Sequence, residues 1–299
     1  MPLSLSGTGV ALITPFRPDA SIDWAALDRL VDHVIDGGVD YVVALGTTGE
    51  PITLSGRECR QVFDRLLHRV AGRVPVVAGM FGGNDTRALE AKIRDYAFDG
   101  FAAIMSSSPA YNKPTQEGIY QHYSRVADAA PLPVLIYNVP GRTASHVTAA
   151  TILRLAAQGA DRFVGVKDAS GDLRQAMQLA AGAPAGFHVL CGEDALVLPF
   201  LAAGGGGGIS VVANALPGAF SALVRAARGG DFATARSLNA PLLALDHWLY
   251  CENNPAGIKA ACEALGLCDR QTRLPILPFT AEHLPQLRRA LEGVRHAVG

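Results

Sequence analysis

Cysteine is scarce in this 299-residue chain: it has five, an odd number, and none forms a C-x-x-C pair. A disulfide framework and a cysteine-ligated zinc site therefore find no support. The eight histidines show no H-E-x-x-H or comparable ligand spacing, so we predict no metal site. We expect five reduced thiols: Cys59, Cys191, Cys251, Cys262 and Cys268.

An excess of charge and long apolar runs are also missing. Lys and Arg number 26 against 27 Asp and Glu, and no stretch is strongly basic, which argues against nucleic-acid or anionic-membrane partners. No apolar run approaches the roughly 20 residues of a membrane-spanning helix. Residues Met1 to Gly9 lack the basic segment and long apolar stretch of a secretory signal. We therefore expect a cytoplasmic protein whose partners are small molecules.

What the chain does have is an alternation of short, β-branched apolar runs with longer segments of helical periodicity. Hydrophobic residues make up 49% of it, enough for a large core. Nearly continuous apolar runs are typical of parallel strands buried on both faces. Eight of them predict strands: Val10–Thr14, Tyr41–Leu45, Val74–Ala78, Phe101–Met105, Val134–Tyr137, Phe163–Lys167, His188–Cys191 and Gly208–Val212.

Helix signals fill the intervening segments. Asp23 can cap one helix, and Ser55 with Glu58 forms the capping box of the next. Eight strand–helix units within residues 1–230 predict a (β/α)8 TIM barrel, a fold of typically ~250 residues. An open, doubly wound sheet is the alternative, because periodicity does not distinguish closure from an edge. Residues 231–299 predict a C-terminal helical extension with helices at Ala233–Trp248, Pro255–Leu265 and Ala281–Ala297.

Lys167 is the first candidate for chemistry, because it ends the sixth apolar run. Catalytic residues of such barrels lie at the carboxyl ends of the strands. A lysine there is desolvated, which favours the neutral amine that attacks a keto-acid carbonyl to form an imine. The alternative is a structural ion pair with Asp168 or another carboxylate.

Three loops after strands carry further candidates. Gly46-Thr47-Thr48-Gly49-Glu50 offers hydroxyl and amide groups to a carboxylate, or is an ordinary strand–helix turn. Tyr137 and Arg142 follow the fifth run, where a tyrosine can relay protons and an arginine can bind a carboxylate; a packed tyrosine and a solvated arginine are the alternatives. Tyr111 follows the fourth run and can reach its own site or a partner's.

Taken together, these loops resemble the dihydrodipicolinate synthase / N-acetylneuraminate lyase family of pyruvate-dependent aldolases. The resemblance runs from Gly7 to about Pro278, nearly the whole chain. It rests on an ordered set of motifs: Gly9–Phe16, Gly46–Glu50, Tyr111–Gly118, Tyr137–Thr143, Gly165–Gly171, Cys191–Asp194 and Gly208–Ser210.

The resemblance implies a role for each candidate. Lys167 forms the imine with pyruvate, so no cofactor or metal is needed. Thr47, Tyr137 and Tyr111 form a proton relay, with Tyr111 supplied by the adjoining subunit of a dimer or of a homotetramer built as a dimer of dimers. The groups that bind substrate are Thr48, Arg142, the Ile209 backbone and Gly192.

Within the family, Tyr137–Thr143 and the Lys167 stretch resemble the branch that condenses pyruvate with L-aspartate-4-semialdehyde to 4-hydroxytetrahydrodipicolinate, in lysine and diaminopimelate biosynthesis. Arg142 suits an aldehyde that carries a carboxylate. The alternatives are a catabolic, pyruvate-releasing aldolase acting on N-acetylneuraminate, a 2-keto-3-deoxy sugar acid or 4-hydroxy-2-oxoglutarate, and a non-catalytic keto-acid-binding barrel.

Several positions differ from the familiar family pattern. Ala110 stands where many synthases have an interface tyrosine, Ala144 replaces a glycine, and Asn254–Lys259 departs from N-P-I-P-V-K. At the positions where lysine-inhibited members bind lysine, the chain has Pro51, Gly56, Cys59, Ala88 and Ala110, with only Asn84 retained. Loss of these polar groups predicts weak or absent inhibition by lysine.

Overall fold

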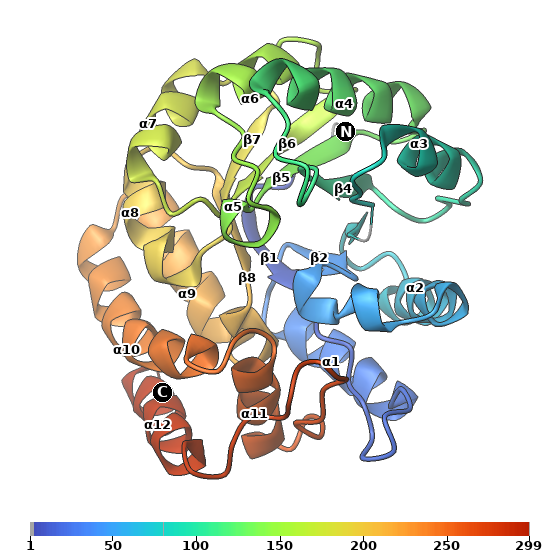
Figure 1. Cartoon of the computed structure of the whole chain (residues 1–299). Coiled ribbons are helices and arrows are strands. Elements are labelled where there is room, and N and C mark those ends of the chain that lie inside the picture. Colours follow the sequence, from blue (N-terminus) through green and yellow to red (C-terminus); the bar gives the residue numbers. More distant parts are fainter. Residues whose placement is uncertain (1–2, 80, 299) are drawn as a thin grey trace.

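Eight parallel strands close into a barrel in the order β1 to β8 (Figure 1). The structure is a computed structural model that describes residues 3–79 and 81–298. Positions 1, 2, 80 and 299 lie outside the described residues, so the first residues of the predicted barrel (1–230) and the last residue of the predicted extension (231–299) are not described. The strands are β1 (Gly7–Ala11), β2 (Tyr41–Ala44), β3 (Val76–Ala78), β4 (Ala103–Ser107), β5 (Val134–Asn138), β6 (Phe163–Asp168), β7 (His188–Cys191) and β8 (Gly207–Ser210).

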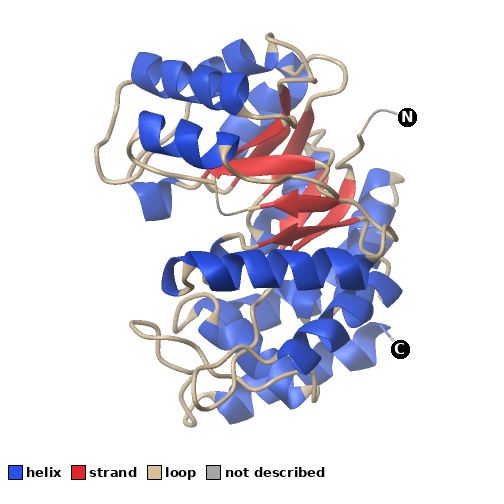
Figure 2. Cartoon of the chain, turned by 90° about the vertical axis from the view of Figure 1, so that its right-hand side faces the viewer, coloured by secondary structure: helices blue, strands red, loops and turns tan. Residues whose placement is uncertain are grey.

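Closure of the ring comes from the parallel pairing of β8 with β1, in which Gly7 lies opposite Gly207 and Gly9 opposite Ile209. The TIM-barrel prediction is therefore confirmed, and the alternative of an open sheet is wrong. Figure 2 shows the strands in red with helices on both sides of them. The helices that follow the strands are α1 (Trp24–Asp36), α2 (Gly56–Val70), α3 (Thr86–Arg94), α4 (Gln116–Ala129), α6 (Ala149–Ala156), α7 (Leu173–Gly182), α8 (Val197–Ala202) and α9 (Pro217–Arg228).

The predicted helix starts are present. The Asp23 carboxylate accepts a hydrogen bond from the Ala26 backbone N–H at 3.0 Å. Ser55 and Glu58 form a reciprocal capping box at the start of α2. Each cap satisfies backbone donors that would otherwise have no partner in the first helical turn.

Side chains alternate between two cores along each strand. In β2, Tyr41 and Val43 point into the barrel, while Val42 and Ala44 face the surrounding helices. This period of two follows from strand geometry. It explains why the strands read as continuous apolar runs, because both faces are buried.

The first and last strands differ from their predicted bounds. We predicted 10–14 and 208–212, but β1 begins earlier at Gly7 and β8 ends earlier at Ser210. Asn214 explains the difference, because its side chain accepts the Ile13 N–H at 3.0 Å and donates to the Ala11 carbonyl at 2.8 Å. The Leu12 N–H still donates to the Val43 carbonyl at 3.1 Å, but from Ile13 onward the side chain of Asn214 replaces the ladder, so the chain leaves the sheet despite its apolar character.

Three helices follow the barrel, as predicted: α10 (Phe232–Tyr250), α11 (Ala256–Ala264) and α12 (Leu284–Val298). In Figure 1 they form the orange to red layer beside α9 and α1, and α10 packs against both α9 and α12. Within residues 3–79 and 81–298, none of the helices combines the length and apolar character needed to cross a membrane.

Candidate active site

Lys167 lies inside the barrel near the end of β6, with 5% of its surface exposed. It is paired in the ladder with Tyr137 of β5, and its Nζ lies 4.5 Å from the centroid of the Tyr137 ring. Among the described residues no carboxylate oxygen lies within 4.0 Å of this Nζ. The Asp168 carboxylate instead accepts hydrogen bonds from Asn138 at 2.9 Å and Gln175 at 3.1 Å. The ion-pair alternative with Asp168 is therefore wrong.

Gly192 leaves the room that the Lys167 side chain occupies. A Cβ at position 192 would meet Lys167 Cε at 3.1 Å and Ala169 Cβ at 2.7 Å. A contact of 2.7 Å is shorter than two carbon atoms tolerate, and the short Ala169 side chain cannot turn away, so the flexible end of Lys167 would have to move as well. Glycine at this position therefore keeps the amine-bearing end of Lys167 accessible.

Two carboxyl groups follow Gly192 and lie near the lysine. Burial raises the pKa of both Glu193 and Asp194, while the positive charge of Lys167 opposes that rise in each. Asp194 also accepts the backbone N–H groups of Val211 and Val212 at 2.8 and 2.7 Å. These bonds tie the loop after β7 to the loop after β8 beneath the site.

A cavity of about 410 Å³ opens beside these residues at the carboxyl ends of β2 to β5. Lys167 does not line this cavity. Tyr137 connects the two, because its side chain lines the cavity and its ring lies over the Lys167 amine. The other lining residues are Thr47, Glu50, Pro51, Ile52, Thr53, Gly79, Gly82, Gly83, Asn84, Ser107, Ala110, Arg142, Asn254, Pro275 and Ile276.

The loop that carries Thr47 and Thr48 is a short 3-10 helix, η1 (Thr47–Gly49). Thr47 lines the cavity, whereas Thr48 is 2% exposed and its hydroxyl accepts a hydrogen bond from Asn254 Nδ2 at 2.9 Å. The loop ends at Glu50, whose φ of 55° lies in the left-handed region. Such a φ is uncommon for a residue with a side chain and persists where neighbouring contacts hold it.

Those contacts come from the C-terminal extension. Lys259 Nζ of α11 lies 2.5 Å from Glu50 Oε1, and both side chains are buried. The Arg273 backbone N–H donates to Glu50 Oε2 at 3.2 Å, and Lys259 also donates to the Gln271 carbonyl at 2.8 Å. The C-terminal extension thus holds the loop Thr47–Glu50, to which we assign substrate binding below and which we call the substrate loop, through a buried ion pair.

The remaining candidates lie in three settings. Arg142 sits in the short helix α5 (Pro140–Thr143), is exposed, and lines the cavity. Ile209 belongs to the cluster inside the barrel that also contains Tyr137. Tyr111 is 87% exposed and does not line the cavity, although its backbone N–H donates to the Thr143 carbonyl at 3.1 Å.

Sequence reasoning missed the residues that brace η1. Glu50 appeared within a motif without a role, and Asn254 and Lys259 appeared only as a departure from a family pattern. Their distance along the chain from Thr48 hides the contact. A buried lysine in an apolar helix that starts after Asn254-Pro255 was the signal that could have suggested an ion pair.

The fold and this site define a barrel enzyme: among the described residues, a buried lysine has no carboxylate oxygen within 4.0 Å, a tyrosine ring lies over its amine, and Thr47 lines the cavity beside them. The chain belongs to the Dihydrodipicolinate synthetase family, whose sequence profile matches residues 4–294. The family resemblance predicted from its motifs is thus confirmed.

Named relatives agree with this assignment. The chain is 46% identical over 289 residues to a 4-hydroxy-tetrahydrodipicolinate synthase of Neisseria meningitidis serogroup B, covering 97% of this chain and 98% of the relative. It is 43% identical over 289 residues to the enzyme of that name from Parabacteroides distasonis, covering 97% of each. Its fold matches the chloride-inhibited dihydrodipicolinate synthase of Acinetobacter baumannii, solved with pyruvate, with a TM-score of 0.92, 37% identity and coverage of 98% and 99%.

Proposed function

We propose that this chain is a class I aldolase that condenses pyruvate with L-aspartate-4-semialdehyde to 4-hydroxytetrahydrodipicolinate, a step of lysine and diaminopimelate biosynthesis. One observation carries the proposal: Lys167 is a buried lysine with no carboxylate within 4.0 Å among the described residues. The other buried lysine of the barrel end, Lys259, is ion-paired with Glu50. Among the described residues, Lys167 is therefore the buried lysine whose amine is free of an ion pair, and we assign to it the attack on the keto-acid carbonyl.

The chemistry begins when Lys167 Nζ attacks the C2 carbonyl of pyruvate. Loss of water leaves an imine, and removal of a C3 proton gives an enamine whose carbon attacks the aldehyde. The aldehyde oxygen takes up a proton, and attack of the substrate's own amine on C2 releases the lysine as the ring closes. No metal or organic cofactor enters these steps.

Protons move through hydroxyl groups near the imine. The Tyr137 hydroxyl is the group we assign to proton transfer, because its ring already lies against the lysine amine. Thr47 lines the same cavity, and we assign to it the place between Tyr137 and Tyr111 in the relay. Since Tyr111 is exposed and outside its own cavity, we assign it to the site of an adjoining subunit.

Substrate binding falls to the two loops beside the cavity. Thr48 and its backbone hold the pyruvate carboxylate, with the Ile209 backbone and Gly192 forming the rest of that pocket. Arg142 lines the entrance and pairs with the carboxylate of the incoming aldehyde, for which a guanidinium is well suited.

We infer the assembly of the protein from Tyr111 and its cellular location from the cysteines. A relay that uses Tyr111 of a neighbour requires a dimer, and we infer a dimer or a dimer of dimers. The five free cysteines support a cytoplasmic location, where thiols stay reduced.

Trapping of the imine tests the proposal directly. The chain has four lysines, Lys92, Lys113, Lys167 and Lys259, so borohydride reduction with pyruvate followed by peptide mass mapping identifies the adduct without ambiguity. We expect one adduct, at Lys167, and its loss in Lys167→Met but not in Lys113→Met, which alters an exposed lysine.

Turnover of pyruvate with L-aspartate-4-semialdehyde, coupled to dihydrodipicolinate reductase and NADPH, completes the test. We expect turnover that disappears in Lys167→Met. An adduct without turnover, together with pyruvate release from a sugar acid or 4-hydroxy-2-oxoglutarate, identifies the catabolic alternative. Absence of any adduct in the folded protein identifies a non-catalytic keto-acid-binding barrel.

A further inference from the structure

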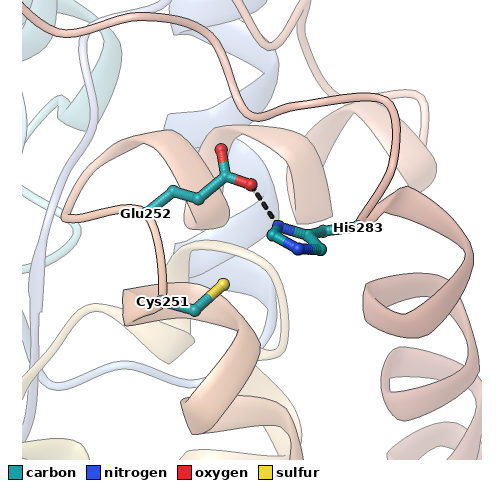
Figure 3. A group of neighbouring side chains, drawn as sticks. All are labelled: Cys251, Glu252 and His283. Atoms are coloured by element: carbon teal, nitrogen blue, oxygen red, sulfur yellow. Dashed lines mark hydrogen bonds and ion pairs between the residues drawn. The ribbon is translucent and has the colours of Figure 1, made fainter.

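Three metal-ligating side chains gather away from the cavity, where α10 ends and the segment before α12 passes. Cys251 Sγ, a Glu252 carboxylate oxygen and a His283 ring nitrogen all lie within 4.8 Å of one another (Figure 3). Glu252 and His283 are 31 positions apart in the sequence. Folding alone brings them together, so a search for closely spaced ligands in the sequence does not find the group.

The carboxylate is held by a residue outside this group. Thr280 donates to Glu252 Oε1 from its hydroxyl at 2.6 Å and to Oε2 from its backbone N–H at 2.9 Å. Hydrogen bonds of this kind orient a carboxylate before a cation arrives. The remaining lone pairs of Glu252 face His283, whose Nδ1 is hydrogen-bonded to Oε1, as the dashed line in Figure 3 marks.

The imidazole and the thiol are placed as well. Trp248 and Phe279 pack around the His283 ring, with ring centroids 5.8 and 6.0 Å from it. Cys251 caps the end of α10 and is exposed, so an ion reaches its sulfur from solvent. Two of the three ligands thus have their orientation set by neighbours, and the third is accessible.

The donor set selects the kind of cation. Thiolate, imidazole and carboxylate are the three ligand types of zinc, whereas calcium and magnesium take oxygen ligands. Zinc bonds of about 2.0–2.3 Å place tetrahedral ligand atoms roughly 3.3–3.7 Å apart. A group already within 4.8 Å therefore needs shifts of only about 1 Å to surround the ion.

We propose that Cys251, Glu252 and His283 bind a zinc-type divalent cation, with water as the fourth ligand. The ion replaces the hydrogen bond between Glu252 and His283, and the thiol proton passes to solvent. The bound ion ties the end of α10 to the start of α12. It also anchors the segment that leads into Asn254, the residue whose side chain holds Thr48 in the substrate loop.

Metal titration of the full-length protein tests this site. After chelator treatment and its removal, Zn²⁺ is titrated in competition with a chromogenic chelator, and we expect one tightly bound ion per chain. Co²⁺ in the same site gives a thiolate-to-cobalt charge-transfer band, which Cys251→Ala abolishes. His283→Ala and Glu252→Gln weaken binding more than Thr280→Val, for which we expect a loss of about 10–100-fold, as for other residues that orient a ligand.

Matched variants separate this site from adventitious binding. Glu282→Gln and His296→Ala change exposed residues of the same types outside the group and leave the affinity unchanged, while Cys59→Ala retains the cobalt band. Retained turnover of pyruvate shows that the Cys251→Ala protein is folded. The proposal is overturned by substoichiometric binding in the parent protein, or by binding and a cobalt band that survive Cys251→Ala.

Discussion

Replacing Lys259 by methionine removes one half of the ion pair that braces the substrate loop. The Lys259 and Glu50 side chains have relative exposures of 0% and 2%, so water cannot replace the lost partner without opening the structure. The lysine also lies 4.0 Å over the Phe16 ring and donates to the Gln271 carbonyl. Methionine keeps most of the apolar stem and its contact with Phe16, so the substitution mainly tests the charge.

The expected loss of stability is large. Removing one partner of a buried pair costs about 3–5 kcal/mol, because a buried charge is left uncompensated. That is roughly two to four orders of magnitude in the unfolding equilibrium. Urea unfolding at equal protein concentration, followed by circular dichroism, measures it. The double variant Lys259→Met/Glu50→Gln removes both charges and should recover most of the loss, since an apolar or neutral pair is tolerated in such sites.

Activity adds a second readout. In Lys259→Met, Glu50 loses its ion-pair partner and keeps the hydrogen bond from the Arg273 backbone N–H, so its left-handed φ is held less firmly. We expect Thr48 to shift and the KM for pyruvate to rise more than kcat falls. A stability change below about 1 kcal/mol, the magnitude of an exposed ion pair, would refute the reasoning. So would a double variant as unstable as Lys259→Met.

Other predictions follow from single contacts. Gly192→Ala brings a methyl group against Lys167 Cε, so borohydride trapping with pyruvate falls at least tenfold while the circular dichroism spectrum stays unchanged. Burial, with Asp194 adding to it, raises the pKa of Asp246 to about 7 against an ordinary value of 3.8. The folded state thus holds this proton more tightly, and stability falls as pH rises from about 4 to about 7. Asp246→Asn removes its share of that slope, while Glu193 and Asp194, whose pKa burial also raises, keep theirs. Urea midpoints at the two ends of this range measure the difference. Tyr111→Phe lowers kcat. Mixing this variant with Lys167→Met under subunit exchange restores part of the turnover, because each hybrid dimer contains one site in which both residues are intact. If turnover is not recovered, Tyr111 acts in the site of its own subunit. L-Lysine inhibits turnover weakly or not at all in a steady-state assay, whereas inhibition at low lysine concentration contradicts the interpretation of the altered interface positions.

The barrel could be predicted from sequence because its signals are local. Strands buried on both faces read as apolar runs, and the alternation of Tyr41 and Val43 with Val42 and Ala44 between two cores makes every position in β2 apolar. Lys167 was identifiable for the same reason, as a charged residue that ends such a run. Closure, by contrast, depends on backbone pairing between Gly7 and Gly207, and glycines carry no pattern that predicts a partner.

The contacts that hold Thr48 and Glu50 could not be predicted from the sequence, because they join segments about two hundred residues apart. Asn254 and Lys259 are ordinary polar residues until the fold places them against Thr48 and Glu50. No periodicity links these pairs, and a lysine in an apolar helix is usually read as solvated. The same limit hid the group of Cys251, Glu252 and His283, because Cys251 follows α10 whereas His283 precedes α12.

These placements divide the work of the site between two parts of the chain. The barrel interior holds Lys167, to which we assign the reacting amine, and the glycine at position 192 and the ring of Tyr137 define the space around it. The extension supplies no reacting group; through Asn254 and Lys259 it sets the position of the threonine loop. An apolar pair would fill the volume of Lys259 and Glu50 with equal or better stability. It would not hold position 50 in the left-handed conformation that follows Thr48 and Gly49, which is why we assign the buried pair to positioning and not to stability.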